Sequence, residues 1–428
     1  MRYLSSFFSL EVFFTLWLFS YQYKKAANLF LNYDITLLLT ALLIPWGLIL
    51  YFKGKGIRKG RFLDYPVAAF LVMSGWFLTT TLWSLSYEYK MQKALCYAVY
   101  TLPGFLIGCL VICTEQRRVR RLLMTFFIFS FLLLLECLRT FWGKGLSRIT
   151  DVLGSNYLVT GQTLVTGLSV LMAWSFTRFT IKDDRQPLRA PLKSLQFSQL
   201  PGLLGLFLSG LYVYVLLNLG GRGPLIAFGL ALSCFYLIHW WRYSGIKPAT
   251  HLGLFLAFSM LAWFSLNKVF DHTSSHFIHR LSPLLIGQVD ESVAERVSYY
   301  QSALAAISQH PITGVGLGGW PMVQGSGDIA LHPHNIFLEI LAETGIIGSI
   351  LFVAFSLLSV HNVLRAFSFS SSAHIAIILI TLTSFCNALK SGDLHDNIVL
   401  FVSLSLCAGL KKQETNDLSW SETQVDNH

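Results

Sequence analysis

Charged residues are scarce in this sequence. They make up 13% of the 428 residues, whereas a soluble domain carries about 25%. So few charges cannot cover a surface that faces water, which excludes a soluble globular protein. The long Leu, Phe and Ile runs also lack the period-two alternation of membrane β-strands, which excludes an outer-membrane barrel.

The polar elements of several other classes of protein are also missing. No cysteine lies in the long polar segment near residue 300, so neither a disulfide framework nor a cysteine metal site is expected. No internal repeat is visible, so the sequence gives no support to an inverted-repeat transporter. The formal charge of +10 does not indicate a nucleic-acid partner, because the basic residues lie in short segments between apolar runs. The seven cysteines lie in or beside those runs: Cys96, Cys109, Cys113, Cys137, Cys234, Cys386 and Cys407.

Apolar runs long enough to cross a bilayer recur along the chain. Hydrocarbon about 30 Å thick requires roughly 20 residues of helix, and this predicts an all-α polytopic membrane protein. The first run has no small-residue cleavage site before Lys24, so we expect a retained span and not a removed signal peptide. About twelve spans are predicted, at 4–22, 32–52, 66–85, 94–113, 122–141, 157–177, 201–219, 223–241, 252–270, 337–361, 374–389 and 397–410.

Lysine and arginine predict the orientation. Five lie in 53–61, four in 117–121 and five in 178–193, and an inside N-terminus places all three segments inside. The domain plan is then spans one to nine in 1–270, an outer loop in 271–336, spans ten to twelve in 337–412, and a polar, disordered inner tail in 413–428. A connection as long as the outer loop is usually functional.

An amphipathic helix is predicted inside the outer loop, ending before Pro311. Arg296 lies one turn before Tyr300 on this helix. It either contributes to a functional site or extends its charged end from an apolar surface to the membrane interface. The turn that follows, ITGVGLGGW, allows tight bends or a phosphate cradle, although it lacks the Lys-Ser/Thr ending of a nucleotide P-loop. The apolar positions at helical spacing are Val293, Val297, Tyr300, Ala303, Leu304 and Ile307.

A His-Pro-His-Asn cluster opens the tenth span. Pro333 restricts His332 to an extended backbone, and Asn335 is a suitable cap for the next helix. A histidine here can act as a general base toward a hydroxyl, which is worth about 10²–10⁴ in rate. Two alternatives remain: that His332 and His334 bind a metal, and that they only hydrogen-bond the loop.

Two carboxylates and several isolated arginines complete the candidates. Glu339 and Glu343 share one face of the tenth span, where a carboxylate needs a partner, and a histidine or an arginine is expected. Gly345 and Gly348 are expected to let another helix approach closely. Arg222, flanked by glycines in NLGGRGPL, is suited to bind an anion or to extend to the interface. Arg148 and Asn156 are weaker candidates of the same kind.

These motifs together resemble the bacterial O-antigen ligase/polymerase family. The resemblance covers about residues 150–400, and it rests on GGRG near a span end, on ERVSYYQSALAAISQHPITGVGLGGW and on HPHNIFLEILAETGIIG. The most specific part is His334-Asn335 followed at fixed spacing by Gly345 and Gly348.

The resemblance implies a GT-C-like glycosyltransferase of the bacterial inner membrane, with its active site on the periplasmic side. The donor would be a glycan on undecaprenyl pyrophosphate, and the acceptor a sugar hydroxyl of lipid A–core. No metal or other cofactor is implied. The family's functional residues would carry over to Arg222 and Arg296, which bind the pyrophosphate, and to His334, the catalytic base. His332, Asn335, Glu339, Glu343 and Arg148 would support them.

Two other functions remain open at this point. A polymerase of the same family would extend the lipid-linked glycan. A transporter would fit the number of spans, although carriers usually place their sites in mid-membrane and not at one face.

Overall fold

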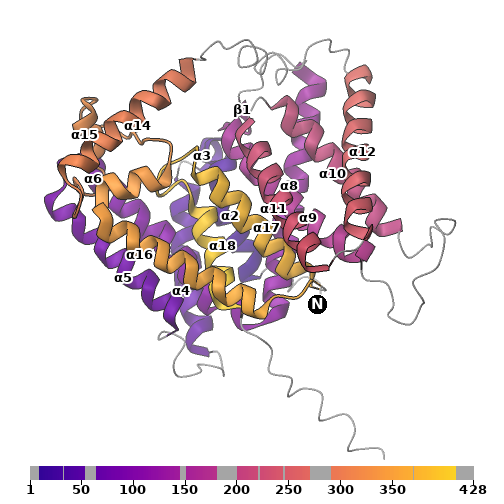
Figure 1. The fold of residues 1–428 in the computed structure, drawn as a ribbon, viewed down its shortest axis with the longest axis horizontal. Helices are drawn as coiled ribbons and strands as arrows, with labels where there is room; N and C mark the ends of the chain where they lie inside the picture. Colours follow the sequence, from indigo (N-terminus) through magenta and orange to yellow (C-terminus); the bar gives the residue numbers. More distant parts are fainter. Residues whose placement is uncertain are drawn as a thin grey trace, which may run out of the picture.

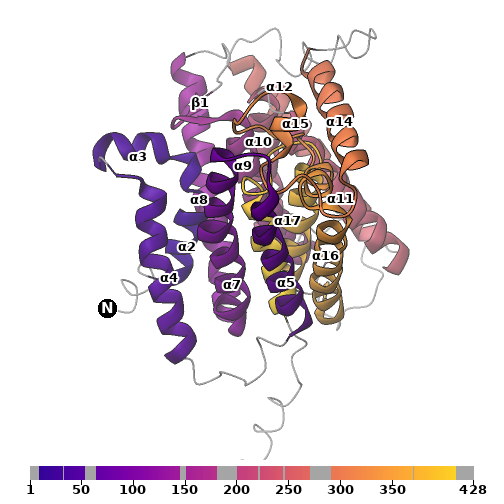
Figure 2. The ribbon, with the colours of Figure 1, turned by 90° about the vertical axis from the view of Figure 1, so that its left-hand side faces the viewer.

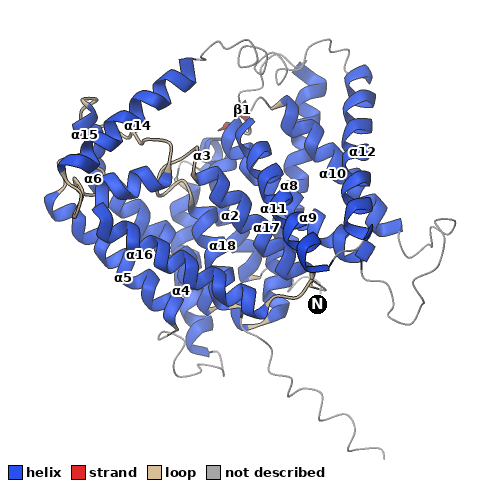
Figure 3. Cartoon of the chain, in the orientation of Figure 1, coloured by secondary structure: helices blue, strands red, loops and turns tan. Residues whose placement is uncertain are grey.

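The chain folds into an all-α membrane protein, as predicted (Figure 3). The computed structural model describes residues 9–31, 33–53, 64–144, 151–180, 200–219, 222–243, 246–269, 291–369 and 371–410. Among these residues, eight helices are long and apolar enough to cross a membrane, and three shorter apolar helices accompany them. The predicted inner tail lies outside the described residues.

Each of the twelve predicted spans overlaps a helix. The longer helices are α4 (Ile35–Lys53), α5 (Tyr65–Thr79), α8 (Gln116–Lys144), α9 (Tyr157–Thr180), α10 (Leu200–Asn218), α11 (Arg222–Tyr243), α12 (Ile246–Val269), α14 (Glu291–Gln309), α16 (Ile336–Ala366) and α17 (Ser372–Ala388). The shorter ones are α2 (Leu10–Leu18), α3 (Lys24–Leu31), α6 (Glu88–Cys96), α7 (Leu102–Leu110), α15 (Trp320–Gln324) and α18 (Ile398–Gly409).

Short turns connect several of these helices. A π-helical turn, Tyr97–Thr101, joins α6 to α7, so the fourth span begins at Glu88 and not at residue 94. Lys90 and Lys93 make the first turns of this helix polar, so composition alone does not show where it begins. Turns of 3₁₀ helix cover Ser20–Gln22, Thr80–Trp83 and Ile112–Thr114. A hairpin of two short strands, β1 (Asp151–Val152) and β2 (Ser155–Asn156), precedes α9.

Helix α18 lies at the centre of the bundle, and all of its residues are buried. It packs against α7, α16 and α17, while α17 also packs along α9 and α11. Figure 2 shows α4, α5, α7 and α16 running side by side along the bundle. Because protein surrounds α18 on all sides, its 12 residues can be apolar all round.

Helices α14 and α15 lie across one end of the bundle (Figures 1 and 2). Ala303 and Ala306 of α14 are buried against Trp320 and Ala342, so this helix has an apolar inner face as predicted. Val297 and Leu304, predicted to share that face, are exposed instead. The small alanines allow close packing on α16, whereas Val297 and Leu304 point outward.

Helix α16 bends at Gly345, which has a φ of +68°. A Cβ there would lie 2.1 Å from the carbonyl oxygen of Ile312, so only glycine fits. The prediction that Gly345 allows another helix to pack closely is therefore wrong. This glycine instead breaks the helix. Gly348 does lie close to α5, because a Cβ there would be 3.2 Å from the Phe77 ring, although the Thr344 side chain of its own helix would be closer still.

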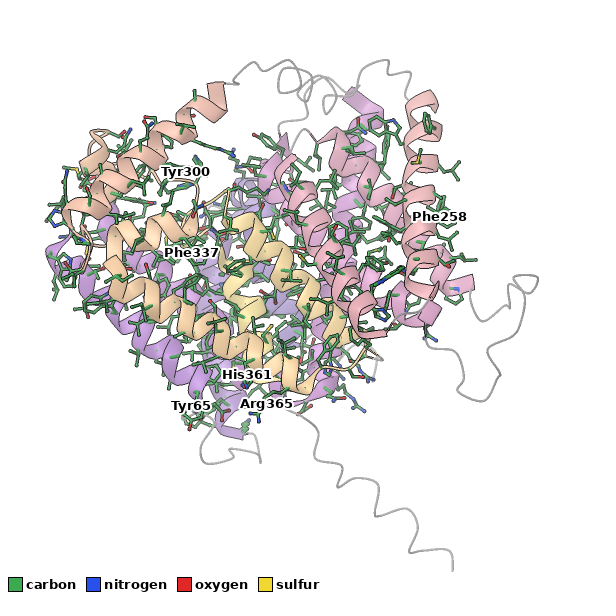
Figure 4. All side chains as sticks on the ribbon, in the orientation of Figure 1. Tyr65, Phe258, Tyr300, Phe337, His361 and Arg365 are labelled. Carbon is green, nitrogen blue, oxygen red and sulfur yellow. The ribbon has the colours of Figure 1, made fainter. Side chains whose placement is uncertain are left out.

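The two ends of α16 lie at opposite ends of the bundle. Phe337 lies near Tyr300 of α14, whereas His361 and Arg365 lie near Tyr65, where α5 begins (Figure 4). Arg365 therefore lies at the end of the bundle opposite the start of α16.

Candidate active site

His334 lies just before α16 and is held there by its neighbour. The side-chain oxygen of Asn335 accepts hydrogen bonds from the backbone N–H groups of Phe337 (3.0 Å) and Leu338 (3.2 Å). Its side-chain nitrogen donates to the carbonyl oxygen of Leu389 at 3.1 Å. The predicted cap is confirmed, and it also ties the start of α16 to the end of α17.

The backbone of His334 is unusual. Its φ is +55°, and among the described residues only one other non-glycine, Leu153, has a positive φ. Such a conformation is uncommon outside glycine and often marks a functional position. The imidazole is half-buried and stacks on the Tyr299 ring, with centroids 6.1 Å apart. Burial, together with the charge of Arg296, lowers the pKa of His334.

His332 contacts His334 directly. Its Nε2 lies 3.1 Å from Nδ1 of His334, so the two rings share a hydrogen bond. Burial lowers the pKa of His332 to about 4, so that this ring is neutral at physiological pH. Among the described residues the two histidines do not belong to any group of three or more closely placed metal ligands.

Two cations meet near this pair of histidines. Arg296 of α14 is half-buried, and its charge acts on both His334 and Lys390. Lys390 directly follows α17, and its Nζ donates to the side-chain oxygen of Asn387 at 3.2 Å. Burial, and then Arg296, lower the pKa of Lys390 to about 8. Neither Arg296 nor Lys390 forms an ion pair with a carboxylate in the part of the chain that the structure describes.

Arg222 begins α11 beside Lys390. A Cβ on Gly223 would lie 2.4 Å from the Lys390 Nζ, so the ammonium group rests against the backbone next to Arg222. Nothing is described of the Arg222 side chain itself. The structure thus brings the backbone of Arg222, the side chain of Arg296 and His334 to one place. We call Arg296 and Lys390, together with this start of α11, the cationic cluster.

Glu339 and Glu343 share a partner that the sequence did not predict. Lys93 Nζ lies 2.5 Å from Glu339 Oε1 and 2.8 Å from Glu343 Oε2, and all three side chains are buried. The prediction that a histidine or an arginine pairs with these glutamates is therefore wrong, because their partner is a lysine. Lys93 comes from α6, so these ion pairs fix the first part of α16 to the fourth span.

Asp393 links the same carboxylates to a further histidine. It accepts a hydrogen bond from the Tyr89 hydroxyl (3.0 Å) and lies 2.7 Å from His395 Nδ1. The neighbouring Leu394 N–H donates to Glu339 at 3.1 Å. Burial opposes a charge on His395, but the hydrogen bond and charge of Asp393 outweigh it and raise the pKa of His395 to about 9. We call Lys93, Glu339, Glu343, Asp393 and His395 the ion-paired cluster.

The glycine-rich turn packs against protein backbone and does not form an open cradle. Gly316 has a φ of +87°, and a Cβ there would lie 2.3 Å from the Ser84 Cα. The N–H groups of Val315 and Gly316 donate to the carbonyl oxygens of Ala342 and Glu343, each at 2.9 Å. These donors are used within the protein, so this turn clamps α16 and does not offer the phosphate cradle considered above.

Asp328 is a second contact that the sequence did not predict. Its carboxylate accepts from the Ser86 hydroxyl (2.5 Å) and from the backbone N–H groups of Tyr87, Glu88 and Tyr89 (2.7–3.1 Å). Asp328 therefore caps α6 from outside and fixes the loop before His332. The hydrogen bond from Ser86, together with those from the backbone, holds the pKa of Asp328 well below its usual range.

Two candidates remain, Asn156 and Arg148. Asn156 caps α9, with its side-chain oxygen 3.0 Å from each of the N–H groups of Leu158 and Val159. Arg148 lies outside the described residues. Sequence reasoning also missed Lys390 and Asp393, although one signal was available. The short segment LKSGDLHDN, at 389–397, joins two predicted spans on the predicted outer side and is rich in ionisable residues.

This fold and site define a multispan membrane protein that gathers cations and imidazoles at one end of its bundle. The model of a family described as O-antigen ligase matches residues 205–353, and this confirms the resemblance that the motifs indicated. The matched residues include Arg222, Arg296, His334 and both glutamates. No curated protein matches the sequence.

Proposed function

We propose that this protein is an O-antigen ligase. It transfers a polysaccharide from undecaprenyl pyrophosphate to a sugar hydroxyl of lipid A–core during lipopolysaccharide biosynthesis. The reaction takes place on the periplasmic side of the bacterial inner membrane. It inverts the anomeric carbon and uses no metal. The family match and the cationic cluster support this proposal.

The cationic cluster is the observation that supports the proposal most. Breaking the bond between a sugar and a diphosphate leaves negative charge on the leaving group, and preplaced cations stabilise that charge. The charge of Arg296 disfavours protonation of Lys390, and neither residue has a carboxylate partner among the described residues. A dianionic ligand would form charge-assisted hydrogen bonds with both cations and would relieve the repulsion between them. In the proposal, Arg222 and Arg296 bind the pyrophosphate and Lys390 adds a third charge.

His334 supplies the base in this proposal. Its neutral imidazole takes the proton of the acceptor hydroxyl, whose oxygen forms a bond to the anomeric carbon. The bond from that carbon to the phosphate oxygen breaks, and its electron pair leaves with the undecaprenyl diphosphate. The lowered pKa of His334 favours the neutral, basic form of the ring at physiological pH.

The test uses purified protein with lipid-linked donor and lipid A–core, followed by electrophoresis. His334→Ala is expected to lower transfer by about 10²–10⁴-fold, and Arg296→Ala to weaken it strongly. His361→Ala, at the other end of α16, is the matched control and should keep full activity. Full transfer by His334→Ala would remove this mechanism. Longer lipid-linked chains in place of capped core would identify a polymerase, and transfer lost with EDTA and restored by a divalent ion would indicate a metal site.

A further inference from the structure

The hydrogen bond between the two imidazoles raises the question of which atom carries the proton. A neutral imidazole donates from one nitrogen and accepts at the other, and the bond at one nitrogen determines the state of its partner. Nδ1 of His334 faces Nε2 of His332 at 3.1 Å. If His332 donated this bond, the free Nε2 of His334 would carry a proton and could not act as a base. If His334 donates, its Nε2 is left free to accept one.

We propose that His332 is a positioning residue whose Nε2 accepts the Nδ1–H of His334, so that Nε2 of His334 is unprotonated toward the acceptor hydroxyl. This inference rests on the proposed function. When His334 takes the acceptor's proton, its ring becomes an imidazolium and keeps the Nδ1–H bond to His332. His332 itself stays neutral throughout, and the proton later leaves Nε2 of His334 for water.

The surroundings of the pair favour this direction. His332 is half-buried and neutral. Once His334 has taken up the acceptor's proton, both of its nitrogens carry hydrogen, and only a His332 with an unprotonated Nε2 can keep the bond. Its charged neighbours are the Asp393 carboxylate, which attracts positive charge, and Lys93 and His395, which oppose it.

His334 has a different set of neighbours. Arg296 opposes positive charge on its ring and Glu295 favours it, while the Tyr299 ring stacks against it. The left-handed backbone of His334 turns its side chain toward His332. Two separate features, the strained backbone and the stacked tyrosine, therefore fix the ring in the orientation that this bond requires.

The first experiment compares two substitutions at the same position. His332→Leu removes the acceptor, whereas His332→Gln places an amide oxygen close to the position of Nε2. We expect kcat to fall about tenfold in His332→Leu, the size expected for one lost hydrogen bond, and to recover largely in His332→Gln. The KM for the lipid-linked donor should not change, because the proposal assigns diphosphate binding to the cationic cluster and not to His332.

The pH profile separates positioning from packing. Without its acceptor the His334 imidazolium is less stable, so its pKa falls and the acidic limb of kcat/KM should move to lower pH in His332→Leu. In His332→Gln this limb should lie near that of the wild type. Wild-type kcat with an unmoved acidic limb in His332→Leu would overturn the inference. Equal losses in the Leu and Gln variants would also overturn it, because they indicate packing alone.

A second measurement does not depend on the variants folding well. Nitrogen-15 NMR of histidine-labelled wild-type protein in bilayers, with His334→Gln to assign the signal, reports the tautomer directly. We expect the Nδ1–H tautomer, and an Nε2–H tautomer would overturn the inference while leaving the proposed function in place. Full activity of His334→Ala would instead remove the proposed function, and the inference with it.

Discussion

The ion-paired cluster and the cationic cluster lie at the same end of the bundle but differ in how their charges are balanced. Lys93 is fully buried and has two carboxylate partners within 2.8 Å, and Asp393 has His395. Arg296 and Lys390 have no carboxylate partner among the described residues, and the charge of Arg296 disfavours that of Lys390. Burying a charge near a membrane is costly unless a partner offsets the cost. In the first cluster the chain supplies the partners, and in the second the proposed function assigns that role to the diphosphate of the donor.

This difference suggests that one cluster stabilises the fold and the other takes part in the activity. The ion-paired cluster joins α6, the first part of α16 and the segment after α17, and so fixes the frame on which His334 is held. The cationic cluster leaves repulsion unrelieved in the free protein, as expected if it is the binding site proposed above. Substitutions in the first cluster should therefore lower stability, and those in the second should lower activity without lowering stability.

Removing Lys93 should have the largest effect. Lys93→Met leaves two buried carboxylates without a cation, and breaking such a pair typically costs about 3–5 kcal/mol. We expect a large loss of folded protein and of thermal stability, measured by size-exclusion chromatography and by thermal unfolding in detergent. Lys90→Met, one turn earlier on α6, is the matched control and should behave like the wild type.

A triple variant sharpens this prediction. Lys93→Met combined with Glu339→Gln and Glu343→Gln has no charge left among these three residues, so much of the lost stability should return. If the triple variant were as unstable as Lys93→Met alone, the loss would come from packing and not from charge.

Lys390→Met should show the opposite behaviour. Removing this cation relieves repulsion on Arg296, so thermal stability should stay the same or rise slightly. Transfer should fall by about 10–100-fold, because a hydrogen bond to a charged group is worth about 1.5–3 kcal/mol, and the loss should appear in the KM for the donor. Lys390→Arg, which keeps the charge, should retain more activity. A Lys390→Met protein that unfolds at lower temperature but binds donor normally would contradict the comparison.

The pH dependence of donor binding should give a smaller effect from the same residue. The pKa of Lys390 is about 8 in the free protein. Above this pH the ammonium loses its proton and the cationic cluster loses one charge, so the KM for the donor should rise as pH increases through about 8. This rise should be absent in Lys390→Met, and in Lys390→Arg it should move beyond the accessible range. An unchanged rise in Lys390→Met would assign it to another group.

The sequence predicted the spans well because their signal is local. Twenty apolar residues in a row identify a helix in a bilayer whatever lies beside it, and Asn335 identifies its cap by the same local rule. Gly345 shows the limit of such rules. Close packing and a break in the helix require the same residue, and only the position of Ile312, more than 30 residues earlier, decides between them.

The partners of the charged residues could not be predicted in this way. Lys93 and Glu339 are 246 residues apart, and nothing in either neighbourhood indicates that they meet. The contact between Gly223 and Lys390 could not be predicted either, because the two residues meet only when α17 packs along α11. The resemblance gave Arg222, Arg296 and His334, since they lie within recognisable motifs. Lys390 and Asp393 lie in a short connection without such a motif, and only the fold places them beside the site.

Substitution of Asp328 should have the smallest effect on stability, because its carboxylate belongs to neither cluster and the residue is partly exposed. Its four hydrogen bonds hold the loop before His332 on the start of α6. Asp328→Asn keeps one acceptor oxygen, so we expect a small fall in the unfolding temperature and faster proteolysis at 325–331. Since the pKa of Asp328 is lowered in the folded protein, its contribution is fully present at neutral pH and is lost only as pH falls below the usual carboxyl range. The wild type and Asp328→Asn should therefore become more alike in strong acid. A difference between them that grew on acidification would show that the loop is held in some other way.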